Sequence, residues 1–180
     1  MNNQSTELTI PATTANIYGL IASIFLTPIL LAPFYFLWGL DIHKIIENDY
    51  SYGLQFFLIL LIGTIIHELI HGATAAWYVG MGWKNIRFGV QWQSLTPYCH
   101  SKMPMTAKNY RYVVMSPLII LGLLPYLASL LTGSGWLLTV GVIFTVAAAG
   151  DVMIFWLMRK IAPNEMVQDH PTKVGLLLHV

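Results

Sequence analysis

The chain has 180 residues, of which 56% are hydrophobic and only 9% are Asp, Glu, Lys or Arg. Soluble domains carry about 25% charged residues, so this composition excludes a disordered chain and an ordinary cytosolic enzyme. The formal net charge of +1 at pH 7 excludes a basic nucleic-acid-binding domain, and we expect no nucleic acid as a partner. The single cysteine, Cys99, excludes an internal disulfide and a CxxC site.

Residues 1–16 are polar, contain Glu7 and lack both Lys and Arg. A cleavable signal peptide begins with positive charge, and its apolar core is about 7–15 residues long, shorter than the run that follows here. We therefore expect residues 1–16 to be a polar N-terminal tail that precedes a membrane anchor.

Four windows are long enough to cross a bilayer, which requires about 20 apolar residues. They are residues 17–39, 53–80, 113–132 and 135–158. Within these windows, Glu68 and Asp151 are the only residues of the Asp, Glu, Lys and Arg types. The sequence predicts an all-α membrane protein with a single integral-membrane domain over 17–158, and a cytoplasmic tail over 159–180.

The connection at 81–112 is more than a linker. Apolar and polar residues alternate from Ile86 to Gln93, with Trp92 as the last apolar member, and this period of two is typical of a half-buried strand. Thr96-Pro97 predicts a turn, and Thr106 is placed to cap a short helix that leads into the third span. We expect a short β-containing loop between the second and third helices.

The distribution of basic residues predicts the orientation. All Lys and Arg residues except Lys44, which lies in the 41–52 connection, fall in the 81–112 segment or in the tail. Basic residues are enriched in cytoplasmic loops. We therefore predict a multi-pass protein of the cell membrane with both its N-terminus and its C-terminus in the cytoplasm.

One motif within the second window carries chemistry: His67-Glu68-Leu69-Ile70-His71. On a helix, His67 and His71 lie on one face, about 6 Å apart along the axis. This spacing allows two imidazoles to bind one zinc ion, with Glu68 beside them to act as a base on water. Buried polar groups paired across helices without a metal are the structural alternative.

A catalytic zinc usually has three protein ligands, so a third ligand is needed. The longer pattern HExxHxxGxxH fails, because Thr74 and Trp77 occupy its later positions. Glu165 lies beyond the last window. Asp151 is the only acid in another window, and its distance from that window's cytoplasmic end predicts a depth similar to that of the motif.

Other candidate groups are weaker. Cys99 and His100 are adjacent and could bind a metal, but a second cysteine is missing. Asp169-His170-Pro171 is expected to belong to a solvated tail, and a contact folded back onto the protein is the alternative. His43 and His179 are expected to be solvated or interfacial.

Several short motifs together resemble a known family. They are His67-Glu68-Leu69-Ile70-His71-Gly72, Pro97-Tyr98-Cys99, Ser116-Pro117 and Gly150-Asp151. Over residues 53–158 the chain resembles bacterial membrane proteins classed as "putative zincin peptidases" and, more distantly, the site-2 protease group of intramembrane metalloproteases. The site-2 group has a glycine after its aspartate, whereas here Gly150 precedes Asp151.

The resemblance implies a zinc ion (Zn²⁺) held by His67, His71 and Asp151, with Glu68 as the catalytic residue. We therefore expect a zinc metalloprotease of the HExxH type that cleaves a membrane-associated protein or peptide near the cytoplasmic face of the lipid bilayer. An exposed edge of the predicted strand at 84–93 could bind such a peptide as an added strand, and a strand that packs on the membrane surface is the alternative. A zinc-binding sensor or scaffold without peptidase activity is the alternative, and a metal-free structural protein is a third hypothesis.

Overall fold

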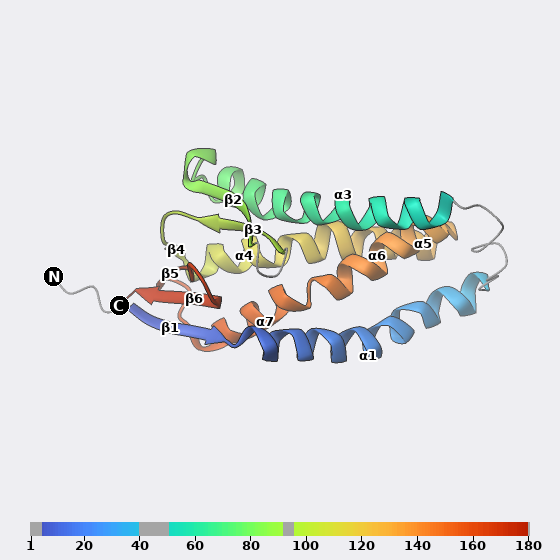
Figure 1. Cartoon of the computed structure of the whole chain (residues 1–180), viewed down its shortest axis with the longest axis horizontal. Helices are drawn as coiled ribbons and strands as arrows, with labels where there is room; N and C mark the ends of the chain where they lie inside the picture. The colour runs from blue at the N-terminus through green and yellow to red at the C-terminus, as the bar shows by residue number, and fades with distance from the viewer. Residues whose placement is uncertain (1–4, 40–50, 92–95, 180) are drawn as a thin grey trace.

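A computed structural model describes residues 5–39, 51–91 and 96–179. Within them, four helical segments are long and apolar enough to cross a membrane: Thr13–Trp38, Gly53–Tyr78, Ala107–Thr132 and Gly135–Lys160. Each has 26 residues, about 39 Å of helix, against a hydrocarbon core of about 30 Å. The segments run along the length of the molecule (Figure 1), as the prediction of a multi-pass membrane protein requires.

The first two spans are nearly regular. Helix α1 covers Ala12–Trp38, and α3 covers Ser51–Ala73 before it widens into a π-helical turn at Thr74–Tyr78. Helix α1 therefore begins inside the segment that was expected to be a polar tail. Residues 40–50 lie outside the described residues, and they include His43 and Lys44 of the predicted connection at 41–52.

The last two spans are interrupted. The third consists of α4 (Ala107–Pro117), a π-helical stretch (Leu118–Leu123) and α5 (Leu124–Thr132). The fourth consists of α6 (Gly135–Ala147), α7 (Ala149–Leu157) and a 3-10 turn. The Thr106 side chain accepts a hydrogen bond from the Asn109 backbone N–H, so the predicted cap of α4 is confirmed.

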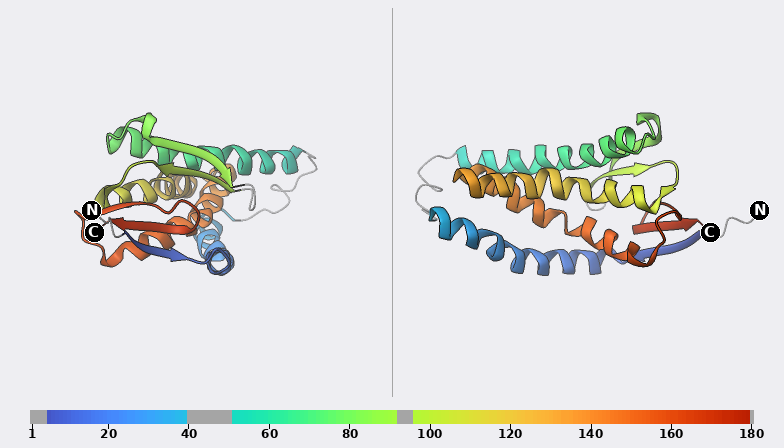
Figure 2. Two further views of the ribbon diagram at one scale, coloured as in Figure 1. Left: turned by 60° about the vertical axis from the view of Figure 1, so that its left-hand side comes forward. Right: turned by 180° about the vertical axis from the view of Figure 1, so that it is seen from behind.

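The prediction of an all-α domain was wrong in part, because a four-stranded antiparallel sheet covers one end of the helices. Its strand order is β1-β6-β5-β4. The strands are β1 (Ser5–Ile10), β4 (Met105–Thr106), β5 (Met166–Asp169) and β6 (Val174–His179). Strands β1 and β6 therefore pair the two segments that were expected to be tails, and both views of Figure 2 show them together at one end of the molecule.

A second sheet is the hairpin of β2 (Ile86–Gln91) and β3 (Thr96–Ser101). The predicted strand is confirmed from Ile86 to Gln91, whereas Trp92 and Gln93 lie outside the described residues. The turn predicted at Thr96-Pro97 was wrong, because these residues begin β3.

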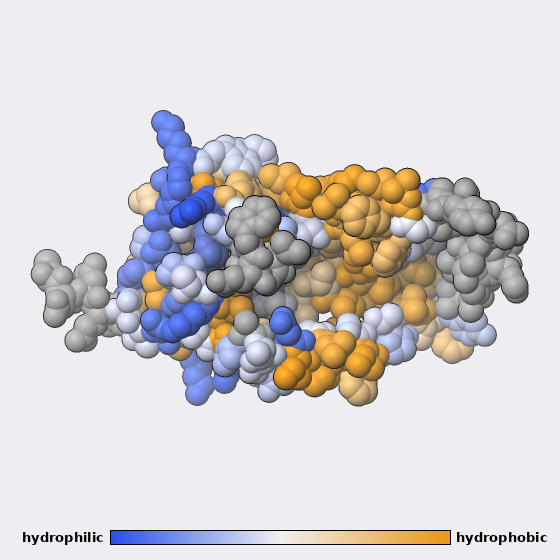
Figure 3. Space-filling model, in the orientation of Figure 1, coloured by the Kyte–Doolittle hydropathy of each residue, from blue (hydrophilic) through white to orange (hydrophobic). Residues whose placement is uncertain are grey.

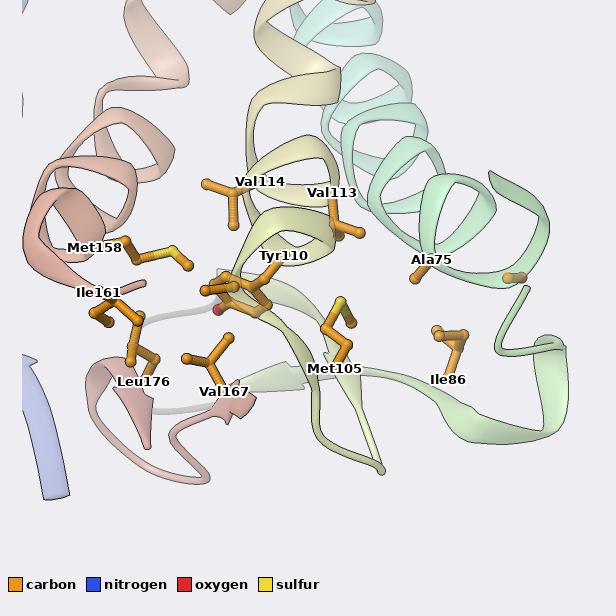
Figure 4. Packing of buried hydrophobic residues seen from close by; sticks show 12 residues of the cluster. Ala75, Ile86, Met105, Tyr110, Val113, Val114, Met158, Ile161, Val167 and Leu176 are labelled. Atoms are coloured by element: carbon orange, nitrogen blue, oxygen red, sulfur yellow. The ribbon is translucent and has the colours of Figure 1, made fainter. Parts of the chain in front are cut away.

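The buried core lies where the helices meet the sheets. Tyr110 of α4 is at its centre, between Met158 on one side and Met105 on the other (Figure 4), and Val167 and Leu176 bring β5 and β6 into the same cluster. Apolar residues cover the outer surface of the helices, whereas hydrophilic residues gather at the end that carries the strands (Figure 3).

Small residues allow the helices to approach closely. A Cβ atom added to Gly63 would lie 2.0 Å from the Phe144 ring, and one added to Gly141 would lie 2.4 Å from the Tyr126 backbone nitrogen. These glycines bring α3 against α6 and α6 against α5, as small residues do between helices in membranes.

Candidate metal centre

Two adjacent turns of α3 and the first turn of α7 form a cluster of possible ligands. His67 Nε2 lies 3.1 Å from Asp151 Oδ2, and His71 Nε2 lies 3.3 Å from Asp151 Oδ1. The three residues offer ligand atoms that all lie within 4.8 Å of one another. The structure therefore brings together the two histidines and the distant carboxylate that the sequence singled out.

The cluster is largely shielded from solvent. The side chains of His67, His71 and Asp151 are 12%, 11% and 15% exposed. Among the described residues, His67 Nδ1 is a buried atom without a hydrogen-bond partner. The Asp151 carboxylate lies beside two imidazole nitrogens in this shielded position, and a cation between the three groups would compensate its negative charge.

The spacing of these atoms fits a zinc ion. Zinc bonds of about 2.0–2.2 Å place tetrahedral ligand atoms roughly 3.3–3.6 Å apart. The separations of 3.1 and 3.3 Å to Asp151 are close to that range, and imidazole nitrogen and carboxylate oxygen are both common zinc ligands. The donor set could thus hold zinc with small adjustments of the side chains.

The orientation of His71 is set by α4. Its Nδ1 lies 2.9 Å from the backbone carbonyl oxygen of Val113, which can only accept a hydrogen bond. Nδ1 therefore carries the proton in this contact and Nε2 is left as the possible ligand atom. The Ser116 hydroxyl also donates to the Val113 carbonyl at 2.8 Å, and the Thr74 hydroxyl donates to Ser116 at 2.9 Å.

The Thr74–Ser116–Val113 network gives Ser116-Pro117 a physical role that the sequence did not reveal. Pro117 lies directly before the π-helical stretch of the third span. The π-helical turn of the second span likewise begins soon after His71, and the fourth span breaks at Ala148, before Asp151. Departures from α-helical geometry are common at functional sites.

Glu68 is placed next to the cluster and faces open space. Together with His71 and Asp151, it lines a cavity of about 1800 Å³. The walls of this cavity also include α1, α4, β3 and the loop that precedes β6. The backbone N–H of Cys99 donates a hydrogen bond to the Glu68 carboxylate, so β3 lies directly against this side chain.

The hairpin is seated on α3 at Gly72. A Cβ atom at this position would lie 2.3 Å from the Phe88 ring and 3.4 Å from Cys99 Sγ. Likewise, a Cβ atom on Gly89 would lie 2.5 Å from the Tyr98 ring. The absence of a side chain at Gly72 lets the hairpin pack closely against α3, and its absence at Gly89 leaves room for the Tyr98 ring. Pro97-Tyr98-Cys99 belongs to β3, the strand that lies next to Glu68.

Cys99 itself is a poor candidate ligand. Burial raises the pKa of its thiol, and the negative charges of Glu68 and Asp169 raise it further. Metals bind the thiolate, which these surroundings disfavour. Among the described residues, the metal-capable cluster contains neither Cys99 nor His100; the His100 ring instead packs against Tyr98, with 4.6 Å between ring centroids.

The other candidates lie away from the cluster. Glu165 accepts a hydrogen bond from the Ala162 backbone N–H at 2.8 Å, close to its own position in the chain. The expectation that His170 is solvated was wrong, because its side chain is 6% exposed and its Nε2 lies 3.5 Å from Glu7 Oε2. His179 is the last residue of β6 and pairs with Ser5.

In the comparison with protein families, the model described as "Putative zincin peptidase" matches residues 60–166. This range covers more than half of the chain and contains all three members of the metal-capable cluster. No curated protein and no solved structure matches the chain.

Proposed function

Because the chain belongs to the family described as "Putative zincin peptidase", we propose that it is a membrane-embedded zinc metallopeptidase. The observation that carries the proposal is the convergence of His67, His71 and Asp151, next to a large cavity that Glu68, His71 and Asp151 line. The order of these residues, an HExxH motif in one span and an aspartate in a later one, is also similar to the site-2 protease group.

In this proposal, His67, His71 and Asp151 hold the zinc ion. The two histidines are neutral and the aspartate is ionised, so acid is expected to release the metal. When bound, zinc supplies a Lewis acid that polarises a peptide carbonyl and lowers the pKa of water towards about 7. The Val113 carbonyl holds the His71 ring so that Nε2 points towards Asp151.

Glu68 is the proposed general base. Its carboxylate takes a proton from the attacking water and passes it to the amine that leaves when the peptide bond breaks. The hydrogen bond from the Cys99 N–H restricts the carboxylate of Glu68, a residue that lines the cavity. His67, His71 and Asp151 need not transfer protons in this scheme.

The substrate is a membrane-associated protein or peptide, and the edge of β3 supports its binding in an extended form. The backbone N–H and C=O of Ser101 both bond to side chains of β5, so they point away from β2. Backbone direction alternates along a strand, which directs the outward carbonyls of Cys99 and Pro97 into the same cavity, whereas the Cys99 N–H is bonded to Glu68 and Pro97 has none. A helical substrate would have to unwind to pair with this edge.

The cleavage site is proposed to lie near the cytoplasmic face. The sheets, with the segment 81–112 and the residues after 158, gather at one end of the helices (Figure 1). All basic residues except Lys44 belong to these segments, and such residues favour the cytoplasmic side. Residues of β3 and of the loop before β6, which belong to this end of the molecule, line the cavity beside the cluster.

Metal content tests the site. Wild-type protein purified in detergent is expected to hold about one zinc per chain. His67→Ala and Asp151→Ala are expected to lose it, whereas Glu165→Gln, which changes a carboxylate outside the cluster, keeps it. Metal-free wild-type protein after purification in zinc-containing buffer would instead support a metal-free structural role.

Cleavage tests the reaction. Glu68→Gln is expected to keep zinc and to abolish cleavage of membrane proteins that accumulate when the gene is deleted, with Glu165→Gln as the matched control. If Glu68→Gln complements the gene deletion while His71→Ala does not, the protein is a zinc-binding sensor or scaffold, and the peptidase proposal is wrong.

A further inference from the structure

A single carboxylate near the end of the chain joins two elements that flank the metal cluster. Asp169 Oδ2 accepts a hydrogen bond from the Ser101 backbone N–H of β3 at 2.8 Å. Its other oxygen, Oδ1, accepts one from the Tyr110 hydroxyl of α4 at 2.5 Å. Asp169 is the last residue of β5, outside the residues that match the family model.

On the β3 side, Asp169 acts close to Glu68. Ser101 is two residues after Cys99, whose N–H donates to the Glu68 carboxylate. Gln168 Nε2 donates to the Ser101 carbonyl at 3.3 Å, so two neighbouring side chains of β5 bond to both outward backbone groups of Ser101. They replace the backbone partner that a further strand would supply and fix the position of β3.

On the α4 side, Asp169 acts close to His71. Tyr110 is 2% exposed, and its ring lies in the centre of the core with its hydroxyl oxygen turned towards the strands (Figure 4). It lies one helical turn before Val113, whose carbonyl accepts the hydrogen bond of His71 Nδ1. A displacement of this turn of α4 would therefore move the acceptor that orients the ring.

We propose that Asp169 is a positioning residue, which holds β3 and α4 at a fixed spacing around the metal centre. The inference rests on the proposed function, since it assigns this contact a role in metal binding and peptide hydrolysis. Asp169 does not touch the cluster; it acts through Ser101 and Cys99 on Glu68, and through Tyr110 and Val113 on His71.

Three variants separate this role from general support of the sheet. Asp169→Leu removes both acceptors at similar size. Asp169→Asn restores an oxygen that accepts from the Ser101 N–H, and its amide can donate to the Tyr110 hydroxyl. This variant should therefore keep β3 and α4 in place. Glu7→Gln is the control, because Glu7 supports the outer strand of the same sheet through its ion pair with Lys173, at 2.6 Å.

Two readouts do not depend on activity. Amide hydrogen exchange is measured by mass spectrometry over 96–101, and the zinc dissociation constant is measured by competition with a chelator. Asp169→Leu is expected to raise exchange at Cys99 and Ser101 at least about tenfold, and to weaken zinc binding by about tenfold. Asp169→Asn should stay near wild type in both, and Glu7→Gln should change neither.

The inference is wrong if Asp169→Leu exchanges at these amides as the wild type does, or if Glu7→Gln weakens zinc binding equally. If Asp169→Leu does not fold, Tyr110→Phe removes only the α4 contact, and zinc binding as tight as in wild type would then overturn the inference. A wild type that binds zinc but cleaves nothing contradicts the proposed function alone, because exchange and zinc affinity still decide the role of Asp169.

Discussion

His71 Nδ1 and the Val113 carbonyl oxygen lie 2.9 Å apart, so a residue of α4 orients the ring of a possible metal ligand on α3. The same carbonyl accepts a hydrogen bond from the Ser116 hydroxyl. An outer partner of this kind orients a ligand and makes it more basic. The geometry of the centre therefore depends on how the second and third spans pack, and on the ligands themselves.

Replacement of Ser116 by alanine should weaken zinc binding without removing a ligand. The variant lacks the hydroxyl that donates to Val113 and accepts from Thr74, so the acceptor of His71 is less well fixed. We expect zinc affinity to fall by up to about tenfold, measured by chelator competition.

Ser129→Ala is the matched control. Ser129 is also buried in the third span, and its hydroxyl also donates to the carbonyl three residues earlier, that of Tyr126, at 2.6 Å. Ser129→Ala loses one hydrogen bond worth about 1 kcal/mol and Ser116→Ala loses two, but only Ser116→Ala is expected to disturb the centre. Equal zinc affinity in the two variants would contradict the role of the network.

Gly72→Ala should displace the hairpin from α3. The added methyl group would lie 2.3 Å from the Phe88 ring, and such overpacking costs about 1–3 kcal/mol. Since Cys99 moves with the hairpin, its contact with Glu68 should be lost. We expect slower cleavage with zinc retained, and a lower midpoint of thermal unfolding.

Two further variants define this effect. Gly53→Ala, on the same helix, meets nothing within 4 Å and should behave as the wild type. Phe88→Ala combined with Gly72→Ala makes room for the methyl group and should recover part of the lost stability. Cleavage by Gly72→Ala alone at the wild-type rate would show that close packing of the hairpin against α3 is not needed for activity.

The Cys99 thiol should resist alkylation. Burial and the charges of Glu68 and Asp169 raise its pKa above the ordinary value of 9.0, so the reactive thiolate is scarce near pH 8. Iodoacetamide is expected to modify the folded protein far more slowly than the unfolded protein. Glu68→Gln removes one of the charges and should increase the rate, whereas a rate unchanged by this substitution would contradict the electrostatic contribution.

The docking of β1 should depend on pH through Glu7. Its hydrogen bond and charge interaction with Lys173 lower the pKa of the Glu7 carboxyl below 4.5, with a smaller contribution from His170. A lowered pKa stabilises the folded state above pH 4.5, and this stabilisation is lost as the pH falls through the lowered value. Protease accessibility of residues 5–10 should therefore rise between about pH 5 and about pH 3. Glu7→Gln should remove this pH dependence; a wild-type profile in the variant would refute it.

The spans and the metal-capable cluster could be predicted because membranes impose strong constraints. Long uncharged windows reveal helices, and ionisable residues inside them, such as Glu68 and Asp151, need a reason to be there. The pairing of Asp151 with the histidines followed from the absence of another acid in the spans. Neither composition nor hydrophobic periodicity could predict the position of β3, which brings Cys99 to Glu68.

The four-stranded sheet could not be predicted for a physical reason. Strands β1 and β6 lie at opposite ends of the chain, and β4 has only two residues, so neither local periodicity nor length indicates their pairing. Asp169 looked like part of a solvated tail because its partners, Ser101 and Tyr110, are more than fifty residues away. Such contacts arise only when the tertiary structure is complete.

The pairing of β1 with β6 also sets an order of assembly. Strand β1 is synthesised before the four long helices that the structure describes, whereas its partner β6 is synthesised after them. Since β5, which carries Asp169, pairs with β6, the support of β3 is also a late event. The support that β5 gives to β3 is therefore completed only after the helices that carry His67, His71 and Asp151 have been made.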